Sequence, residues 1–398
     1  MKKTSILLIT ALLFSIPAAA QITEGLENEI QDTDEDKLID VVILFDEEVD
    51  ELSTNIDLPD NYDNYNISAV ELEASEIYRL EEMDAVERIE KDRVFETQSV
   101  TAGLPKGFYG GLTGENVSVG VMDTGVEASH PYLDVRKSLD FTGEGVGDFD
   151  GHGTHVAGTI ASQHPFYGGV AQGSDIYDVK VLNGSGSGKS SDILEGLDWS
   201  KENDIDILSM SIGSVVSRCN GRDIISRASN RLADSGTAVI VAAGNEGPGN
   251  STVTSPGCAE RVLTVGAADH EDNVASFSGR GPTADGRVKP DIVAPGTSII
   301  STFTGETFRA LSGTSMATPY VSGQAALMME EDPSLEHDDI KATITGTAID
   351  LGEPENLQGH GKANISASID ANHSMYKTET RRGGLWERIV DLLIDLLR

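Results

Sequence analysis

Short apolar runs alternate with amphipathic stretches along the chain from Val117 onward. Runs rich in Val, Ile and Leu predict strands, and apolar residues spaced three and four apart predict helices. The predicted strands are 117–123, 175–182, 205–213, 237–245 and 261–269, and the predicted helices are 153–162, 190–203, 222–236, 314–332 and 338–348. This alternation predicts an α/β domain of three layers, in which helices cover both faces of a mainly parallel sheet.

Residues 21–100 show a different pattern. The stretch "DVVILF" predicts a strand, and residues 68–96 combine helical spacing with a final extended piece. Glycine is scarce here, whereas the link that follows, 97–116, is rich in Gly, Thr and Ser. We therefore predict a small α+β domain that ends near Val100.

The two ends of the chain carry further signals. Lys2 and Lys3 precede an apolar run and the small-residue pattern Ala18-x-Ala20, which predicts a secretory signal peptide over residues 1–20. The residue after the predicted cut is Gln21 and not Cys, which argues against a lipid anchor there. No later run reaches the roughly 18–20 apolar residues that span a bilayer. We expect a secreted protein.

Residues 373–398 are predicted as a linker and an amphipathic helix. The sequence "GGLWERIVDLLIDLLR" places acidic residues on one stripe and leucines on a broad opposite face. Such a helix could pack on its own domain, bind a partner or a second copy, or lie in a membrane surface. Its acidic polar face disfavours the membrane, because interfacial helices usually carry Lys and Arg there.

Net charge and cysteine content narrow the classes of function that the chain could have. The net charge is −37, and residues 21–100 contribute −21 of it. This acidity argues against nucleic acid as a partner, because a phosphate backbone requires Lys and Arg. The two cysteines, Cys219 and Cys258, predict a disulfide in an exported protein.

The stretch "DFDGHGTHVAGTIAS" places His152 and His155 three residues apart. A zinc site would need three or four ligands, and no nearby Glu or Cys completes a set, so we predict no metal site here. A two-carboxylate mechanism is the second alternative, because "MDTG" and "ADSGT" both carry an Asp before Thr-Gly or Ser-Gly. Their settings differ, however: Asp123 follows a predicted strand, whereas Asp234 ends a predicted helix.

The third alternative is nucleophilic catalysis by a serine. The stretch "LSGTSMATP" places Ser315 at the start of a predicted helix, where free backbone N–H groups favour a developing oxyanion. A serine hydroxyl needs a base to remove its proton and an acid to orient that base. Seen alone, Ser315 could equally be a helix cap.

Four motifs, taken in their order along the chain, favour nucleophilic catalysis by a serine. "VMDTGV", "GHGTHVAG", "AAGNEG" and "SGTSMATP" together resemble the subtilisin-like serine proteases, over about residues 105–370. The resemblance implies a subtilisin-like fold and a secreted endopeptidase with an Asp–His–Ser triad. By position, Asp123 orients the histidine, His152 is the general base, Ser315 attacks the peptide carbonyl, and Asn245 donates to the oxyanion. His155 is then a structural neighbour.

The resemblance also implies how peptides bind. Ser211, Ile212 and Gly213 would line one side of the cleft and pair with an extended substrate, and residues 184–188 would line the other side. Residues 21–100 resemble the family's propeptide, an intramolecular inhibitor that is cut from the catalytic domain, residues 101–372. We expect the enzyme to make this cut itself near residues 97–104.

Two departures from the family concern calcium. Tyr132 stands where many members have an acidic residue, and the loop 162–169 is short. We therefore expect that calcium site to be absent, and we assign no other calcium site and no cofactor for the chemistry. The competing hypothesis for function is a catalytically inactive relative that only binds peptides.

Overall fold

The computed structural model describes residues 21–32, 37–45, 60–62, 65–83, 85–97 and 111–372. By its internal contacts the chain divides into two compact units, Met1–Lys91 and Asp92–Arg398. The predicted signal peptide, 1–20, and the predicted C-terminal linker and helix, 373–398, lie outside the described residues.

The smaller unit is built on a five-stranded sheet in the order β1-β5-β2-β4-β3. Its strands are β1 (Gln21–Ile22), β5 (Val86–Lys91), β2 (Ile39–Phe45), β4 (Ile67–Leu72) and β3 (Asp60–Tyr62). Only the pair of β1 and β5 is parallel among these neighbours. Helices α1 (Glu24–Asp32) and α3 (Ala74–Glu81) contact β5, and Ile43, Ile77 and Ile89 are fully buried between the elements. The predicted α+β class is confirmed.

The larger unit contains a seven-stranded sheet in the order β15-β14-β13-β11-β7-β9-β8. The strands are β15 (Ile292–Pro295), β14 (Leu263–Ala268), β13 (Ala238–Ala242), β11 (Ile207–Met210), β7 (Ser118–Asp123), β9 (Asp175–Lys180) and β8 (Val135–Asp140). Every neighbouring pair is parallel. The central strands are buried along their whole length, as expected for a sheet covered on both faces.

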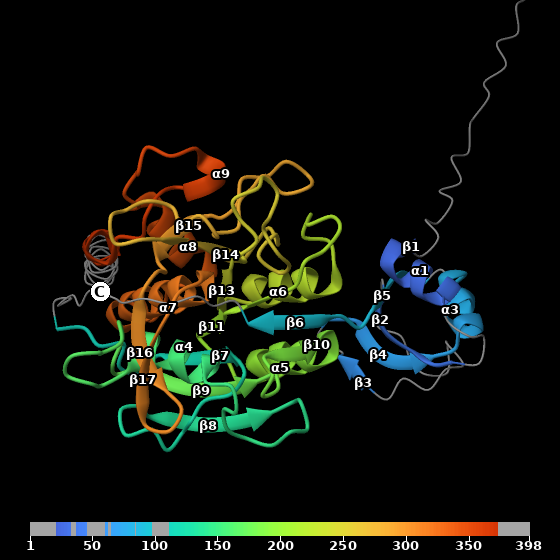
Figure 1. Ribbon diagram of the computed structural model, residues 1–398, viewed down its shortest axis with the longest axis horizontal. Coiled ribbons are helices and arrows are strands. Elements are labelled where there is room, and N and C mark those ends of the chain that lie inside the picture. The colour runs from blue at the N-terminus through green and yellow to red at the C-terminus, as the bar shows by residue number, and fades with distance from the viewer. Residues whose placement is uncertain are drawn as a thin grey trace, which may run out of the picture. The chain divides into compact units, whose positions relative to one another are not determined.

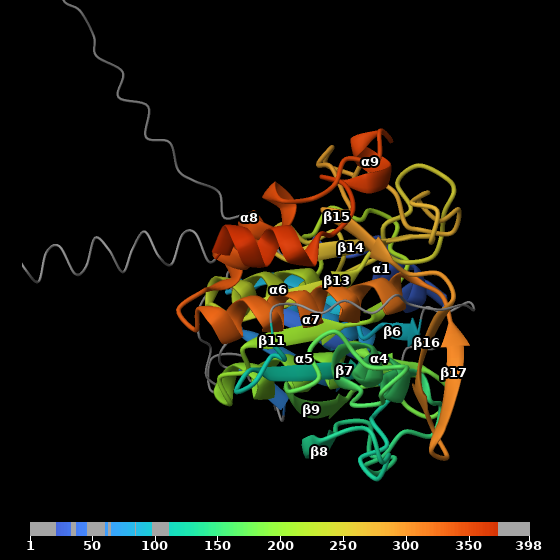
Figure 2. The ribbon, with the colours of Figure 1, turned by 90° about the vertical axis from the view of Figure 1, so that its left-hand side faces the viewer.

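Helices form the two outer layers. α4 (His152–Ala161) packs with α7 (Thr314–Glu331), and α5 (Ser190–Glu202) packs with α6 (Ile224–Asp234). Figure 1 shows these two pairs on opposite sides of the strands, and Figure 2 shows α7 in front of the strands. Two shorter helices follow, α8 (His337–Gly346) and α9 (Glu355–Gln358). The predicted three-layer α/β fold is confirmed.

Glycines bring α4 close to its neighbours. A Cβ added at Gly153 would lie 2.1 Å from the carbonyl oxygen of Gly125, directly beyond β7. A Cβ added at Gly158 would lie 2.0 Å from the hydroxyl of Thr302 in β16 (Ile299–Phe303). β16 forms an antiparallel hairpin with β17 (Thr307–Leu311). The first turn of α4 therefore lies tightly against the end of β7.

The start of α5, at Ser190, agrees with the predicted helix 190–203. Lys189 occupies the N-cap position, and Ser190 and Ser191 are the first helical residues. Their hydroxyls do not cap the helix, because they bond to a distant segment: Ser190 Oγ accepts from the backbone N–H of Arg93, and Ser191 Oγ donates to the carboxylate of Asp92. α6 ends two residues before Gly236, whose backbone is left-handed, with φ of 107°.

A short strand before residue 100 belongs to the larger unit. β6 (Val94–Thr97) lies between β10 (Ser187–Lys189) and β12 (Ile212–Gly213) in an antiparallel three-stranded sheet. Figure 1 shows β6 beside β10. The compact units thus divide at Lys91, ahead of the predicted boundary near Val100. Within the described parts of the chain, no helix combines the length and apolarity needed to cross a bilayer.

Candidate active site

Asp123 and His152 form a buried pair at the carboxyl end of the sheet. Asp123 is the last residue of β7, and His152 is the first residue of α4. Nδ1 of His152 lies 2.6 Å from Oδ1 of Asp123, and the two residues are 2% and 0% exposed. The close approach at Gly153 permits this contact, because a larger residue there would push α4 away from β7.

A second carboxylate, Asp148, ties the two elements together. Its Oδ1 accepts hydrogen bonds from Thr124 Oγ1 (2.9 Å) and the N–H of Gly151 (2.8 Å). Its Oδ2 accepts from the N–H and the hydroxyl of Thr154 (2.9 and 2.6 Å). Asp148 therefore joins the residue after Asp123 to the first turn of α4. Sequence reasoning missed this role, although Asp148 opens the motif that carries His152.

The environment of His152 favours its charged form. Burial lowers the pKa of the imidazole, but the charge of Asp123 and the hydrogen bond to it, together with Asp150 and Asp148, raise this pKa above its ordinary value. The hydrogen bond through Nδ1 leaves Nε2 as the other ring nitrogen for proton transfer. Nε2 is buried and has no hydrogen-bond partner, and the same is true of Oδ2 of Asp123.

Ser315 lies in the first turn of α7 and is fully buried. Its Oγ donates to the backbone carbonyl of Ser211 at 3.0 Å, and Ser211 Oγ donates to the carbonyl of Ser315 at 3.0 Å. Since Nε2 of His152 has no partner, no hydrogen bond joins Ser315 to His152 in this structure. The expected Asp–His contact is present, whereas the expected Ser–His hydrogen bond is not.

Asn245 follows β13 and faces the start of α7. Its Oδ1 accepts from the N–H and the hydroxyl of Thr314, at 3.0 and 3.1 Å. With the oxygen engaged, the amide NH₂ of Asn245 remains available as a hydrogen-bond donor. Gly244, just before Asn245, donates its N–H to the same hydroxyl of Thr314 at 3.1 Å. Thr314 thus fixes the orientation of the Asn245 side chain.

The predicted peptide-binding residues pair with β6. Ile212 lies opposite Thr97 and Gly213 lies opposite Glu96. On the other side of β6, Gly188 lies opposite Phe95. Ser211, the third predicted residue, instead contacts Ser315.

Comparison with known proteins gives the family. Residues 114–361 match the model of the Subtilase family. The chain belongs to the subtilase family. It is 38% identical over 340 residues to an alkaline protease of Alkalihalobacillus alcalophilus. This match covers 83% of this chain and 85% of that relative.

Further relatives include two named proteases. Subtilisin Savinase of Lederbergia lenta is 40% identical over 280 residues, covering 68% of this chain and 99% of that protein. Serine protease AprX of Bacillus subtilis (strain 168) is 39% identical over 297 residues, covering 65% of this chain and 67% of that relative. The resemblance seen in the four motifs is thereby confirmed.

His155 of this subtilase takes a structural position. Its Nε2 donates to the backbone carbonyls of Ile299 and Arg309, at 2.9 and 3.0 Å. Burial lowers the pKa of this imidazole to about 3, so it stays neutral. His155 therefore fastens α4 to the hairpin of β16 and β17, and one turn separates it from His152.

The calcium expectation concerns Tyr132. Its ring lies 4.5 Å from the ring of His164 and 5.8 Å from that of Phe308, centroid to centroid. Tyr167 contacts the same two rings. Across the described ranges, no group of three or more His, Cys, Asp or Glu side chains is arranged to hold a metal.

The predicted disulfide is present between Cys219 and Cys258. It joins the loop after β12 to the loop before β14, with the Cα atoms 5.6 Å apart. In the same loops, the carboxylate of Asp223 accepts from the hydroxyl of Ser255 at 2.7 Å. The disulfide thus holds together two segments 39 residues apart in sequence.

Proposed function

We propose that this subtilase is a secreted serine endopeptidase in which Asp123, His152 and Ser315 form the catalytic triad. The observation that carries the proposal is the buried hydrogen bond between Asp123 and Nδ1 of His152, with Nε2 of the same ring left unpartnered. In this arrangement the carboxylate stabilises the imidazolium that forms when His152 accepts a proton. Membership of the subtilase family supports the same chemistry.

The first step transfers a proton and forms a bond. Ser315 Oγ turns from the carbonyl of Ser211 toward Nε2 of His152 and attacks the peptide carbonyl, while Nε2 takes the hydroxyl proton. The tetrahedral intermediate collapses to an acyl-enzyme, and His152 returns the proton to the leaving amine. A water molecule then repeats the attack and frees Ser315.

We propose that Asn245 stabilises the oxyanion. Its Oδ1 is held by Thr314, so the NH₂ group is available to the negative oxygen that develops at the substrate carbonyl. The backbone N–H of Ser315, in the first turn of α7, is the second donor. Donors that are already oriented cost no reorganisation when charge develops.

We also propose that the enzyme is exported as a precursor. Residues 1–20 would direct export, residues 21–100 would inhibit, and residues 101–372 would form the catalytic domain. The pairing of β6 with β10 and β12 supports the inhibition, because an extended substrate would use the same backbone groups. Cleavage near residues 97–104 by the enzyme itself would follow.

A fluorophosphonate probe tests the catalytic assignment. This probe reacts with an activated serine, so it should label the processed wild-type protein at Ser315 and leave Ser315→Ala unlabelled. Digestion of an unstructured protein such as casein should follow the same pattern. A folded wild-type protein that neither reacts nor digests would favour the inactive peptide-binding relative.

Intact-mass analysis tests the self-processing. Wild type should lose an N-terminal fragment that ends near residues 97–104, whereas Ser315→Ala should keep it. If the Ser315→Ala protein is shortened at the same place, another protease makes the cut.

A further inference from the structure

Arg93 lies immediately before β6 and makes a charged contact with the start of α6. One guanidinium nitrogen is 3.3 Å from Oδ1 of Asp223. The Asp223 side chain is 8% exposed and the Arg93 side chain is 22% exposed. Water therefore screens this ion pair much less than a pair on the open surface.

Asp223 occupies a preformed position. It is the N-cap of α6, where Oδ1 accepts from the N–H of Ser226 at 3.1 Å and Oδ2 accepts from the hydroxyl of Ser226 at 2.7 Å. Ser255 donates a further hydrogen bond at 2.7 Å. Burial raises the pKa of Asp223, but the charge of Arg93 and the serine hydrogen bonds outweigh it, so the carboxyl stays ionised.

The backbone of the same segment is held as an extension of β6. Val94 lies opposite Lys189, and the N–H of Arg93 donates to Ser190 Oγ at 3.0 Å. Asp92 accepts from the N–H and the hydroxyl of Ser191, at 3.1 and 2.7 Å. Ser190 and Ser191, the first two residues of α5, thus bind the segment that leads into β6.

We propose that Asp223, with Ser226 and Ser255, is a subsite for an arginine side chain of an extended peptide. The arginine is three residues before the residue that pairs with Gly213, as Arg93 is relative to Glu96. This inference rests on the proposed function, in which peptide substrates take the place of β6. The enzyme would then prefer substrates that carry a guanidinium at this distance from the cleaved bond.

Binding of an arginine at Asp223 differs from general electrostatic attraction of cationic peptides. With a net charge of −37, the whole chain attracts any cationic peptide. The Asp223 subsite is specific to one position, because the strand register and the serine hydrogen bonds fix where the side chain enters. A charge of the same sign two residues away should therefore contribute little.

Matched peptides test the subsite with the processed enzyme. The parent substrate is a fluorescence-quenched peptide with the sequence of residues 88–104, and its two variants are Arg93→Gln and Lys91→Gln. Both variants remove one positive charge. We expect Arg93→Gln to lower kcat/KM about tenfold, mainly through KM, since a partly buried charge pair is lost. Lys91→Gln should change kcat/KM less than twofold.

The Asp223→Asn enzyme supplies the second half of the test. Asparagine is as good an N-cap as aspartate, so the helix should persist while the charge is lost. This enzyme should cleave the parent and Arg93→Gln peptides equally well. Equal effects of Arg93→Gln and Lys91→Gln on wild type, or none from either, would overturn the subsite and leave the proposed function intact.

A measurement that needs no catalysis distinguishes failure of the Asp223 subsite from failure of the proposed function. In the full-length Ser315→Ala chain, hydrogen–deuterium exchange of the amides of residues 92–97 reports how firmly the segment is held. Arg93→Gln and Asp223→Asn should each speed this exchange, and the double variant should be no faster than either alone. If no peptide is cleaved and this pattern appears, the binding site stands and the catalytic proposal fails; additive effects would reject the pair.

Discussion

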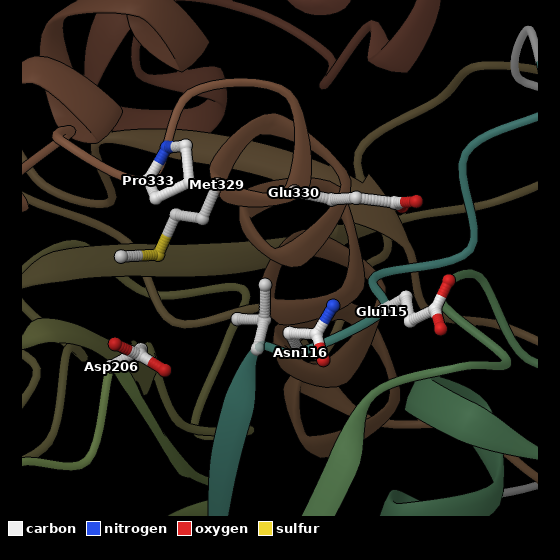
Figure 3. Close-up of a pocket in the computed structure, with 7 residues that line it drawn as sticks. Glu115, Asn116, Asp206, Met329, Glu330 and Pro333 are labelled. Atoms are coloured by element: carbon white, nitrogen blue, oxygen red, sulfur yellow. The ribbon is translucent and has the colours of Figure 1, made fainter.

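The two ends of the parallel sheet differ in the burial and in the pairing of their polar groups. At the amino ends of the strands, the structure has a pocket of about 150 Å³ (Figure 3). It is lined by Glu115, Asn116, Val117, Asp206, Met329, Glu330 and Pro333. At the carboxyl ends lie Asp123, Ser211 and Asn245 with the starts of α4 and α7. In the pocket Glu115 is exposed and Asp206 and Glu330 are partly exposed. At the carboxyl ends Asp123 and His152 are buried, and each has a buried atom without a partner.

Two of the three carboxylates that line the pocket accept hydrogen bonds from neighbouring residues. Asp206 Oδ2 accepts from the N–H and the hydroxyl of Ser118, at 2.8 and 2.6 Å. Glu330 Oε2 accepts from the N–H groups of Thr113 and Gly114, both at 2.6 Å. By contrast, Nε2 of His152 and Oδ2 of Asp123 are buried without partners. Paired groups stabilise the fold, whereas an unpaired group costs about 1–3 kcal/mol and remains available for chemistry.

The largest effect should come from Ser315→Ala. Removing the proposed nucleophile should lower kcat by about 10⁶-fold, as loss of the catalytic serine does in subtilisin. Because Ser315 Oγ bonds only to a carbonyl of Ser211, and the Ser211 hydroxyl holds the same two segments together, the melting temperature should change little. Peptide hydrolysis measures the loss of kcat, and thermal unfolding of the same preparation measures the melting temperature. A large fall in the melting temperature would show that the Ser315 hydroxyl stabilises the fold, as the paired groups of the pocket do.

Asp123→Asn should have the next largest effect. The amide no longer stabilises the imidazolium, and in other serine proteases the corresponding change lowers kcat by about 10⁴-fold. Since the base must be neutral, wild-type kcat/KM should rise with pH through the raised pKa of His152, above the ordinary value of about 6.5. In Asp123→Asn the midpoint should move to lower pH. A midpoint that stays in place would show that Asp123 does not set this pKa.

Asn245→Ala removes one proposed oxyanion donor. We expect kcat to fall by about 10²–10³-fold with little change in KM, the loss seen when the equivalent donor is removed from subtilisin. Thr314→Val should reduce kcat less, because it leaves the amide in place but removes the hydroxyl that orients it. A larger effect from Thr314→Val than from Asn245→Ala would contradict the role of Asn245.

The smallest effect on activity should come from a substitution in the amino-end pocket, Asp206→Ala. Asp206→Ala leaves the N–H and the hydroxyl of Ser118 without their shared acceptor, so the free energy of unfolding should fall by about 1–2 kcal/mol. Values of kcat and KM should stay within about twofold of wild type. Denaturant unfolding and peptide hydrolysis check the two outcomes. A tenfold loss of kcat would show that the amino-end pocket takes part in catalysis.

Strong hydrophobic patterns made the central fold predictable. The strands that became β7, β9, β11, β13 and β14 are apolar runs, and the helices between them carry clear periodicity. β8, with the sequence "VRKSLD", was missed because it lies at the sheet edge and is largely polar. β15 and the hairpin of β16 and β17 were missed because their runs are short and depend on partners distant in sequence.

The candidate site was predictable in its residues and less so in its contacts. Motif order pointed to Asp123, His152, Asn245 and Ser315, but no sequence pattern reveals that the Ser315 hydroxyl bonds to Ser211. Side-chain rotation depends on local acceptors, which only the folded structure brings together. Ser190 and Ser191 show the same limit, because their hydroxyls bind Arg93 and Asp92, from a segment almost a hundred residues away.

The place where the two compact units divide bears on how the precursor would be activated. A cut directly before Asp92 would separate the smaller unit yet leave residues 92–97 attached to the residues that follow. β6 would then remain paired between β10 and β12 as part of the same chain. A cut beyond Thr97 would instead separate β6 from the catalytic domain, so that β6 could dissociate and its effective concentration would fall by dilution. The position of the first cut would therefore decide whether activity appears at once or waits for a second event.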